Sequence, residues 1–176
     1  MSSLVRIEPI GIGPSFGSLI IYSAPRAVTR HIEWTISNLL GLPISLKWNS
    51  QPLEPSRMWC ALTWRAVEGT AARMASELAG WHYLKFELQE TSSNAAENSL
   101  YMFIPELGIF RGAVGPHGDL MINENQINSI LRNSRREIDL VTEIEKSLGK
   151  PWDEELECYR RAIAEDGEGV RDRLSV

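Results

Sequence analysis

The sequence predicts an α+β protein with a ferredoxin-like βαββαβ core, an antiparallel sheet that carries both helices on one face. Two kinds of hydrophobic pattern support this class: short apolar or alternating runs typical of strands, and longer segments with helical spacing. A third observation is their order along the chain, which is β-α-β-β-α-β. With 176 residues, 43% of them hydrophobic, the chain is long enough to bury a substantial core.

The first half of this core contains a strand, a helix and a second strand. A short apolar run predicts a strand over residues 18–23. Pro25 suits the first turn of a helix and Gly41 its end, so we expect a helix over 25–40. Alternating apolar and polar residues then predict a half-buried strand at 44–48, followed by a proline-containing loop at 51–56.

The second half of the core repeats this pattern. Alternating residues predict strands over 57–65 and 82–89, and helical spacing predicts a helix over 68–80 between them. The inner face of this helix carries the small residues Ala71 and Ala75, which allow close approach to a sheet.

The rest of the chain is predicted to extend this core. We expect a loop over 91–98, strands at 100–104, 108–114 and 120–122, and helices at 125–134 and 137–148. A last helix starts near Trp152, and the polar end from 166 to 176 is expected to fray. Residues 1–176 are therefore predicted as a single domain, with a core at about 18–90, a strand extension at about 99–123 and a C-terminal helical region at about 124–165.

Charge and composition exclude several classes of protein. Residues 137–176 contain twelve acidic and six basic residues, a charge of −6, while the remainder has eleven acidic and twelve basic residues, a charge of +1. This distribution argues against general nucleic-acid binding, which needs a basic surface. We expect no membrane span, because no long uncharged apolar run exists, and a cytoplasmic location, because no secretory signal is evident. Cys60 and Cys158 have no ligand-like neighbours and are expected to be buried thiols.

The first candidate site lies in the predicted helix over 25–40. Helical spacing puts Val28, Ile32, Ile36 and Leu39 in one apolar stripe, and Trp34 lies outside it. A large ring away from the core face is either covered by another element or reserved for a partner. The candidate partner-binding residues on this helix are Arg30, His31, Glu33 and Trp34.

The second candidate site is the start of the last helix. Trp152 and Leu156, one helical turn apart, form an apolar patch surrounded by acids such as Glu155. If the patch packs on the domain, it anchors the helix; if it is exposed, the helix binds a partner. We therefore include Trp152, Glu155 and Leu156 among the candidate partner-binding residues, while the anchor is the favoured interpretation.

A third region carries polar groups around a glycine-rich turn. Arg111, His117 and Asp119 are candidate ligand contacts, although hairpin geometry explains the glycines equally well. No catalytic set is predicted, because His31 and Glu33 do not share a helix face and no third group orients the histidine. The three histidines lie on different predicted elements, so we expect no metal site, and nothing indicates a cofactor.

Several segments together resemble a known family. They are Ser23-Ala24-Pro25, His31-Ile32-Glu33-Trp34, Gly108-Ile109-Phe110-Arg111-Gly112-Ala113-Val114, Gly118-Asp119-Leu120-Met121 and Trp152-Asp153-Glu154-Glu155-Leu156-Glu157. Over most of its length the chain resembles the actinobacterial uncharacterised proteins of domain of unknown function 3145. Cys158 stands where the family pattern has proline, and the chain beyond Tyr159 lies outside the resemblance. The resemblance implies a cytoplasmic protein of mycolic-acid-type bacteria and their relatives, linked to regulation of the acyl-CoA carboxylases of lipid synthesis.

These observations favour a non-enzymatic protein that binds and regulates another protein, expected to be a metabolic enzyme. The six tryptophans support this hypothesis, because aromatic residues are frequent in binding hot spots. An alternative is a small-ligand-sensing regulatory domain that dimerises, which rests on analogy with similar folds. An enzyme is the third hypothesis and requires His31, His117 and Asp119 to meet in one pocket. The sequence leaves a homo-oligomer open.

Overall fold

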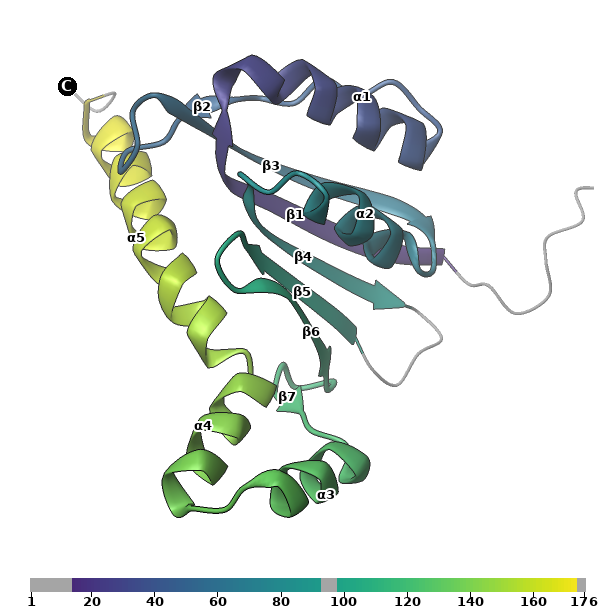
Figure 1. The fold of residues 1–176 in the computed structure, drawn as a ribbon. Coiled ribbons are helices and arrows are strands. Elements are labelled where there is room, and N and C mark those ends of the chain that lie inside the picture. The colour runs from purple at the N-terminus through teal and green to yellow at the C-terminus, as the bar shows by residue number, and fades with distance from the viewer. Residues whose placement is uncertain (1–13, 93–97, 174–176) are drawn as a thin grey trace, which may run out of the picture.

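The computed structural model describes residues 14–92 and 98–173, with side chains up to Asp166, and consists of one sheet with helices around it (Figure 1). The elements are β1 (Pro14–Pro25), a 3₁₀ turn (Arg26–Val28), α1 (Thr29–Leu40), β2 (Asn49–Ser50), β3 (Arg57–Val67), α2 (Thr70–Ala79), β4 (Lys85–Ser92), β5 (Asn98–Ile104), β6 (Gly108–Val114), β7 (Leu120–Met121), α3 (Glu124–Asn133), α4 (Glu137–Ser147) and α5 (Lys150–Arg173).

The strands form a seven-stranded sheet in the order β2-β3-β1-β4-β5-β6-β7, and every neighbouring pair is antiparallel. The predicted α+β class is therefore confirmed. Each predicted helix is present, and the sheet continues through β5, β6 and β7 beyond the four strands of the predicted core.

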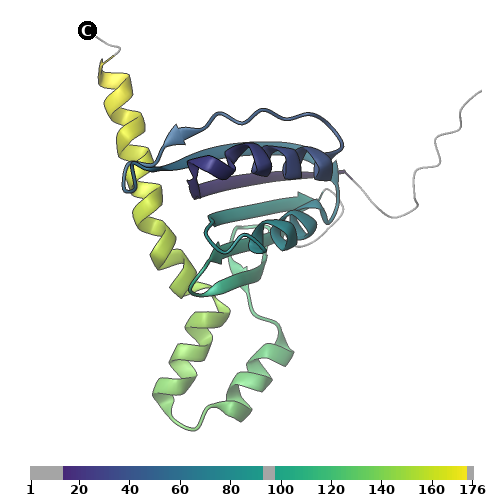
Figure 2. The same ribbon diagram turned by 45° about the horizontal axis from the view of Figure 1, so that its top comes forward.

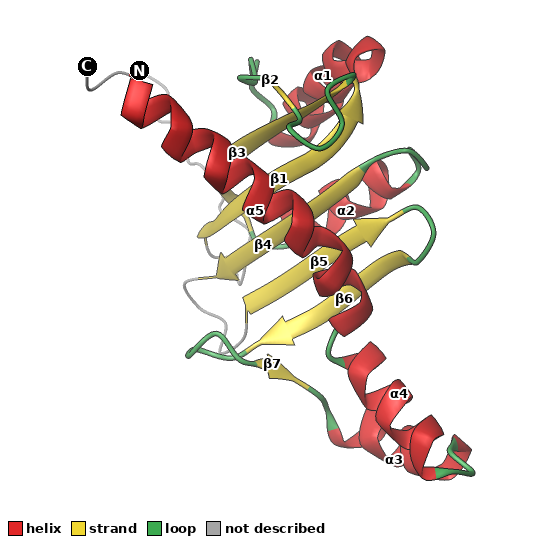
Figure 3. Cartoon of the chain, turned by 90° about the vertical axis from the view of Figure 1, so that its left-hand side faces the viewer, coloured by secondary structure: helices red, strands yellow, loops and turns green. Residues whose placement is uncertain are grey.

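Helices cover both faces of this sheet. Helices α1 and α2 lie side by side on one face, whereas α5 crosses the other face diagonally (Figures 1 and 3). Two hydrophobic cores result: the larger lies under α1 and α2, and the smaller lies between α5 and β1, β5 and β6. A diagonal helix covers only part of a sheet, which leaves the side chains of β1 and β3 around Phe16 exposed.

Strand β1 lies inside the sheet, between β3 and β4, and contributes side chains to both cores. Leu19 and Ile21 are buried under α1 and α2, while Ile20 and Tyr22 contribute to the core under α5. A strand covered on both faces needs apolar residues at successive positions. This explains why the sequence shows a continuous apolar run here and an alternating pattern in β3.

The predicted strand over 44–48 is wrong. The chain between Pro43 and Trp48 is irregular, and only Asn49 and Ser50 pair with β3. Side chains of α1 take the backbone donors instead: Ser37 Oγ accepts from the Ile44 N–H (2.9 Å) and Glu33 Oε1 from the Leu46 N–H (2.9 Å). The alternation of apolar residues reflects packing beside a helix and not strand pairing.

Three other expectations need correction. Strand β4 begins at Lys85 and not at residue 82, because the N–H groups of Tyr83 and Leu84 bond to the Trp81 carbonyl in a turn. Cys60 is buried as expected, but Cys158 is exposed on α5. Residues 166–173, predicted to fray, continue helix α5, and the core of the predicted loop over 91–98 lies outside the described residues.

Two glycines are required by close packing. A Cβ atom on Gly17 would lie 2.1 Å from the Trp64 ring, so β1 can pass beneath this indole only without a side chain. Gly149 joins α4 to α5 with a left-handed φ of 69°, and a Cβ there would lie 2.8 Å from Met102 and Phe110. The turn at Gly149 directs α5 back over the sheet, while α3 and α4 form a hairpin that projects from it (Figure 2).

Candidate partner-binding surface

Helix α1 presents one buried face and one open face. Ile32 and Ile36 are fully buried, and Val28 and Leu39 pack against the same core, which confirms the predicted apolar stripe. Trp34 lies off this stripe and is 68% exposed. No described element covers its ring, so the alternative that another element covers it is wrong.

Glu33 holds the segment that follows α1 against this helix through hydrogen bonds. Besides the Leu46 N–H, Glu33 Oε1 accepts a hydrogen bond from the indole Nε1 of Trp48 at 3.1 Å. Ser37 holds Ile44 one turn further along the helix. The two side chains fix the distance between α1 and the irregular segment.

A groove of about 570 Å³ runs between α1 and this segment. Its lining residues are Thr29, Arg30, Glu33, Trp34, Ser37, Pro43, Ile44 and Trp48. Three of the four residues predicted on this helix, Arg30, Glu33 and Trp34, therefore lie together, whereas His31 is exposed outside the groove lining. Sequence reasoning missed the opposite wall because it assigned Ile44 and Trp48 to a strand.

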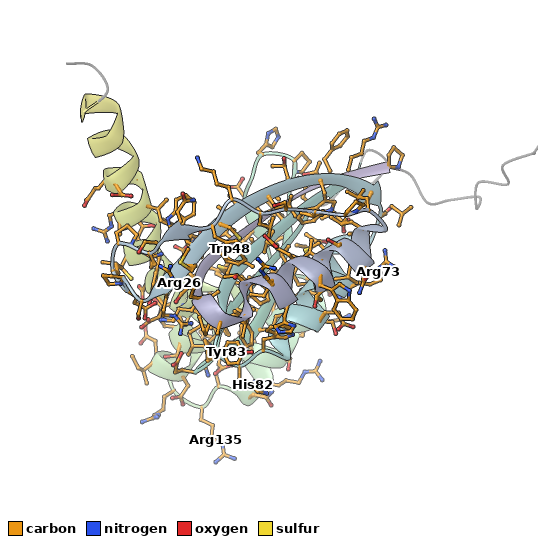
Figure 4. The ribbon with its side chains drawn as sticks, turned by 90° about the horizontal axis from the view of Figure 1, so that it is seen from above. Arg26, Trp48, Arg73, His82, Tyr83 and Arg135 are labelled. Carbon is orange, nitrogen blue, oxygen red and sulfur yellow. The ribbon has the colours of Figure 1, made fainter. Side chains whose placement is uncertain are left out.

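The surroundings of the groove are basic. Arg30 lines it, and Arg26 and Lys47 lie exposed on the adjoining turn and segment. Figure 4 shows Arg26 at the beginning of α1 and Trp48 beside the helix. Glu33, the acidic residue of the groove, is engaged in hydrogen bonds with this segment. The groove thus combines an exposed indole with positive charge on a chain whose net charge is −5.

The second predicted site packs on the sheet and anchors α5. Leu156 is fully buried, and Trp152 packs against Phe110 while its Nε1 donates to the Gly108 carbonyl at 2.9 Å. Trp152, which is partly buried, and Leu156 therefore attach α5 to the sheet, as the favoured interpretation expects. Glu155 remains exposed on the outer side of the helix.

Polar contacts reinforce this attachment, and sequence reasoning did not find them. Arg160 pairs with Glu87 of β4 at 2.8 Å and with Asp153 at 2.7 Å, and its Nε donates to the Tyr22 hydroxyl. Burial acts to lower the pKa of Arg160, but its bonds to Glu87, Tyr22 and Asp153 outweigh burial and raise the pKa. Glu87 and Tyr22 lie 73 and 138 residues from Arg160, so local sequence patterns carry no signal of these contacts.

The three predicted ligand contacts are only partly brought together. His117 and Asp119 are exposed in the turn between β6 and β7, where the Gly115 N–H bonds to the Asp119 carbonyl. Arg111 lines a hollow of about 400 Å³ with residues of β7, α3 and α4, and its guanidinium lies 5.8 Å from the Tyr101 ring centre. His31 lies on α1, toward the opposite edge of the sheet (Figure 1).

In residues 14–92 and 98–173, no three His, Cys, Asp or Glu side chains form a group that could hold a metal ion. Nor does this part of the chain include a helix with the length and apolar character to cross a membrane.

Comparison with known proteins gives one match. The family model described as "Protein of unknown function (DUF3145)" matches residues 18–171, a range that extends well beyond the predicted limit at Tyr159. Searches of the curated proteins and of the solved structures gave no match.

Proposed function

We propose that this chain, which belongs to the DUF3145 family of proteins of unknown function, binds and regulates another protein and is not an enzyme. The observation that carries the proposal is the 68% exposed Trp34 beside the α1 groove. An exposed indole next to a groove is a typical binding hot spot, because a partner can bury a large rigid ring at little cost in side-chain entropy.

The surface indicates the chemistry of the partner. Arg26, Arg30 and Lys47 favour an acidic segment, and the groove between Trp34 and Ile44 favours an apolar side chain beside those acids. Glu33 and Ser37 hold the two walls together before binding, which lowers the entropic cost of association. The partner that we propose to test first is a metabolic enzyme, namely an acyl-CoA carboxylase, because the family resemblance implies it.

The test compares two exposed aromatic residues on different surfaces. Binding to purified acyl-CoA carboxylase subunits is measured by calorimetry for the wild type, Trp34→Ala and Phe16→Ala. Phe16 is 54% exposed on the opposite face of the sheet and serves as the matched control. We expect Trp34→Ala to weaken binding at least tenfold and Phe16→Ala to leave it unchanged, with carboxylase activity altered only by chains that bind.

Two results would contradict the proposal. If Trp34→Ala binds as tightly as the wild type, the α1 groove is not the binding surface. If no carboxylase subunit binds, the same pair of variants is used with partners captured from native lysate. A capture that shows no stoichiometric partner sensitive to Trp34→Ala then overturns the protein-binding function.

A second candidate function is the sensing of a small anionic ligand. It is supported by the hollow beside Arg111, whose lining also includes Asn123, Gln126 and Ser147. A ligand that binds only the folded state must raise the midpoint of thermal unfolding. Carboxylate and phosphate metabolites are therefore screened by thermal shift, and any shift should disappear in Arg111→Ala; the absence of a shift at saturating ligand counts against sensing.

We also propose that β1, α1, β2, β3, α2 and β4 form a ferredoxin-like unit to which the other strands are added. The order β2-β3-β1-β4 of the first four strands supports this. A cytoplasmic location and an actinobacterial source belong to the same proposal.

A further inference from the structure

The α3–α4 hairpin leaves much of its apolar surface uncovered. Leu131 of α3 and Ile138 of α4 are 58% and 62% exposed. Further exposed apolar side chains on the hairpin are those of Ile127, Val141, Ile144 and Leu148. These six side chains are among the fifteen large hydrophobic residues that are exposed in the described part of the chain, and such a concentration on two short helices indicates an interaction surface.

The geometry of the hairpin explains this exposure. The hairpin projects from the β7 edge of the sheet, so the sheet covers neither helix (Figures 1 and 3). On α3, which packs on α4, Ile130 is buried, and the next residue, Leu131, turns about 100° away. On α4, Leu140 is half-buried, and the exposed side chain of the next residue, Val141, points about 100° away from it. Because the two helices run antiparallel, the side chains of Leu131 and Val141 point to the same side of the hairpin.

Charges beside this surface are arranged so that two copies complement each other. Glu124 and Arg132 lie eight residues apart, about 12 Å along α3, on the same flank of the Ile127–Leu131 stripe. Neither forms an ion pair within the described part of the chain. In an antiparallel pair of identical helices the same flanks meet, so the acidic end of one copy lies beside the basic end of the other.

We propose that the hairpin is a dimerisation surface and that its partner is a second copy of this chain. The α3 helices pack antiparallel about a twofold axis, with Ile127 beside the partner's Leu131 and Glu124 within one turn of the partner's Arg132. Two hairpins then form a four-helix bundle, which covers the apolar stripes that a single pair of helices leaves exposed. A parallel arrangement would bring opposite flanks of α3 together, which separates Glu124 from the partner's Arg132 and loses this ion pair.

This dimer is tested by sedimentation velocity and light scattering on the full chain at high micromolar concentration. We expect the wild type to have twice the chain mass of 19.8 kDa and the double variant Leu131→Glu/Val141→Glu to have the mass of one chain. Leu53→Glu, at a 50% exposed leucine on the loop before β3, is the matched control and should remain dimeric. Circular dichroism verifies that each variant is folded.

Charge reversal tests the antiparallel arrangement. Glu124→Arg and Arg132→Glu should each raise the dimer dissociation constant at least tenfold, and the combined variant should restore it toward the wild-type value. A monomeric wild type, or a dimer that Leu131→Glu/Val141→Glu leaves intact, overturns the proposal. Failure of the combined variant to restore dimerisation overturns the antiparallel pairing of α3.

Discussion

At the scale of single residues, Glu33 explains why the alternating apolar residues after α1 do not form a strand. The sequence predicts it as a partner contact, but its Oε1 atom fastens the chain at Leu46 and Trp48 to α1. A backbone donor that would otherwise pair in a strand is thereby satisfied by a helix side chain. The groove beside Trp34 exists because of this contact.

Glu33→Ala should therefore destabilise the fold. The Leu46 N–H and the Trp48 indole lose their acceptor, and an unsatisfied buried donor costs about 1–3 kcal/mol in the free energy of unfolding. Glu33→Gln retains a carbonyl acceptor and should lose less than half as much. Urea unfolding measures both, and an alanine variant as stable as the wild type would show that these bonds do not hold the segment.

At the scale of elements, α5 is anchored by its first half. Trp152, Leu156 and Tyr159 are inserted into the smaller core, and Lys85 donates to the Tyr159 hydroxyl at 2.9 Å. Burial lowers the pKa of Lys85, but its interactions with Tyr159, together with the charges of Glu54 and Glu106, outweigh burial and raise the pKa overall. The i, i+4 spacing of Trp152 and Leu156 indicated an apolar patch, and the tertiary structure covers it with the sheet.

Leu156→Ala should remove an essential part of this anchor. Truncation of a fully buried leucine leaves a cavity and costs about 2–5 kcal/mol in the free energy of unfolding. The adjacent Glu155→Ala, at an exposed position, should change it by less than about 0.5 kcal/mol. Equal stability of the two variants in urea unfolding would mean that α5 is not attached through this face.

At the scale of the whole molecule, each face of the sheet buries one weakly acidic side chain, a thiol or a phenol, whose pKa is raised. Burial, its largest cause, raises the pKa of Cys60 from 9.0 to about 12; a backbone hydrogen bond from Ile21 opposes the shift and Glu33 adds to it. Burial and then Glu87 raise the pKa of Tyr22 well above 10.0, against the opposing effect of Arg160. The two groups lie in the cores under α1 and under α5.

These shifts predict loss of stability at alkaline pH. The folded chain retains protons that the unfolded chain releases. The free energy of unfolding is therefore unaffected by these groups below about pH 9 and decreases as the pH rises toward 12. Urea unfolding at about pH 8 and about pH 10.5 should show a smaller decline for Cys60→Ala and Tyr22→Phe than for the wild type. An unchanged decline in both variants would contradict the shifts.

The sequence by itself determined the class of the protein, its helices, most of its strands and the position of Trp34 outside the apolar stripe of its helix. These features follow from hydrophobic periodicity, which is local and records which face of an element meets the core. Only the tertiary structure decided that Ile44–Trp48 packs beside α1, that α5 crosses the second face of the sheet and that Arg160 joins Glu87 and Tyr22. Those outcomes depend on contacts between residues far apart in the chain, for which local periodicity carries no signal.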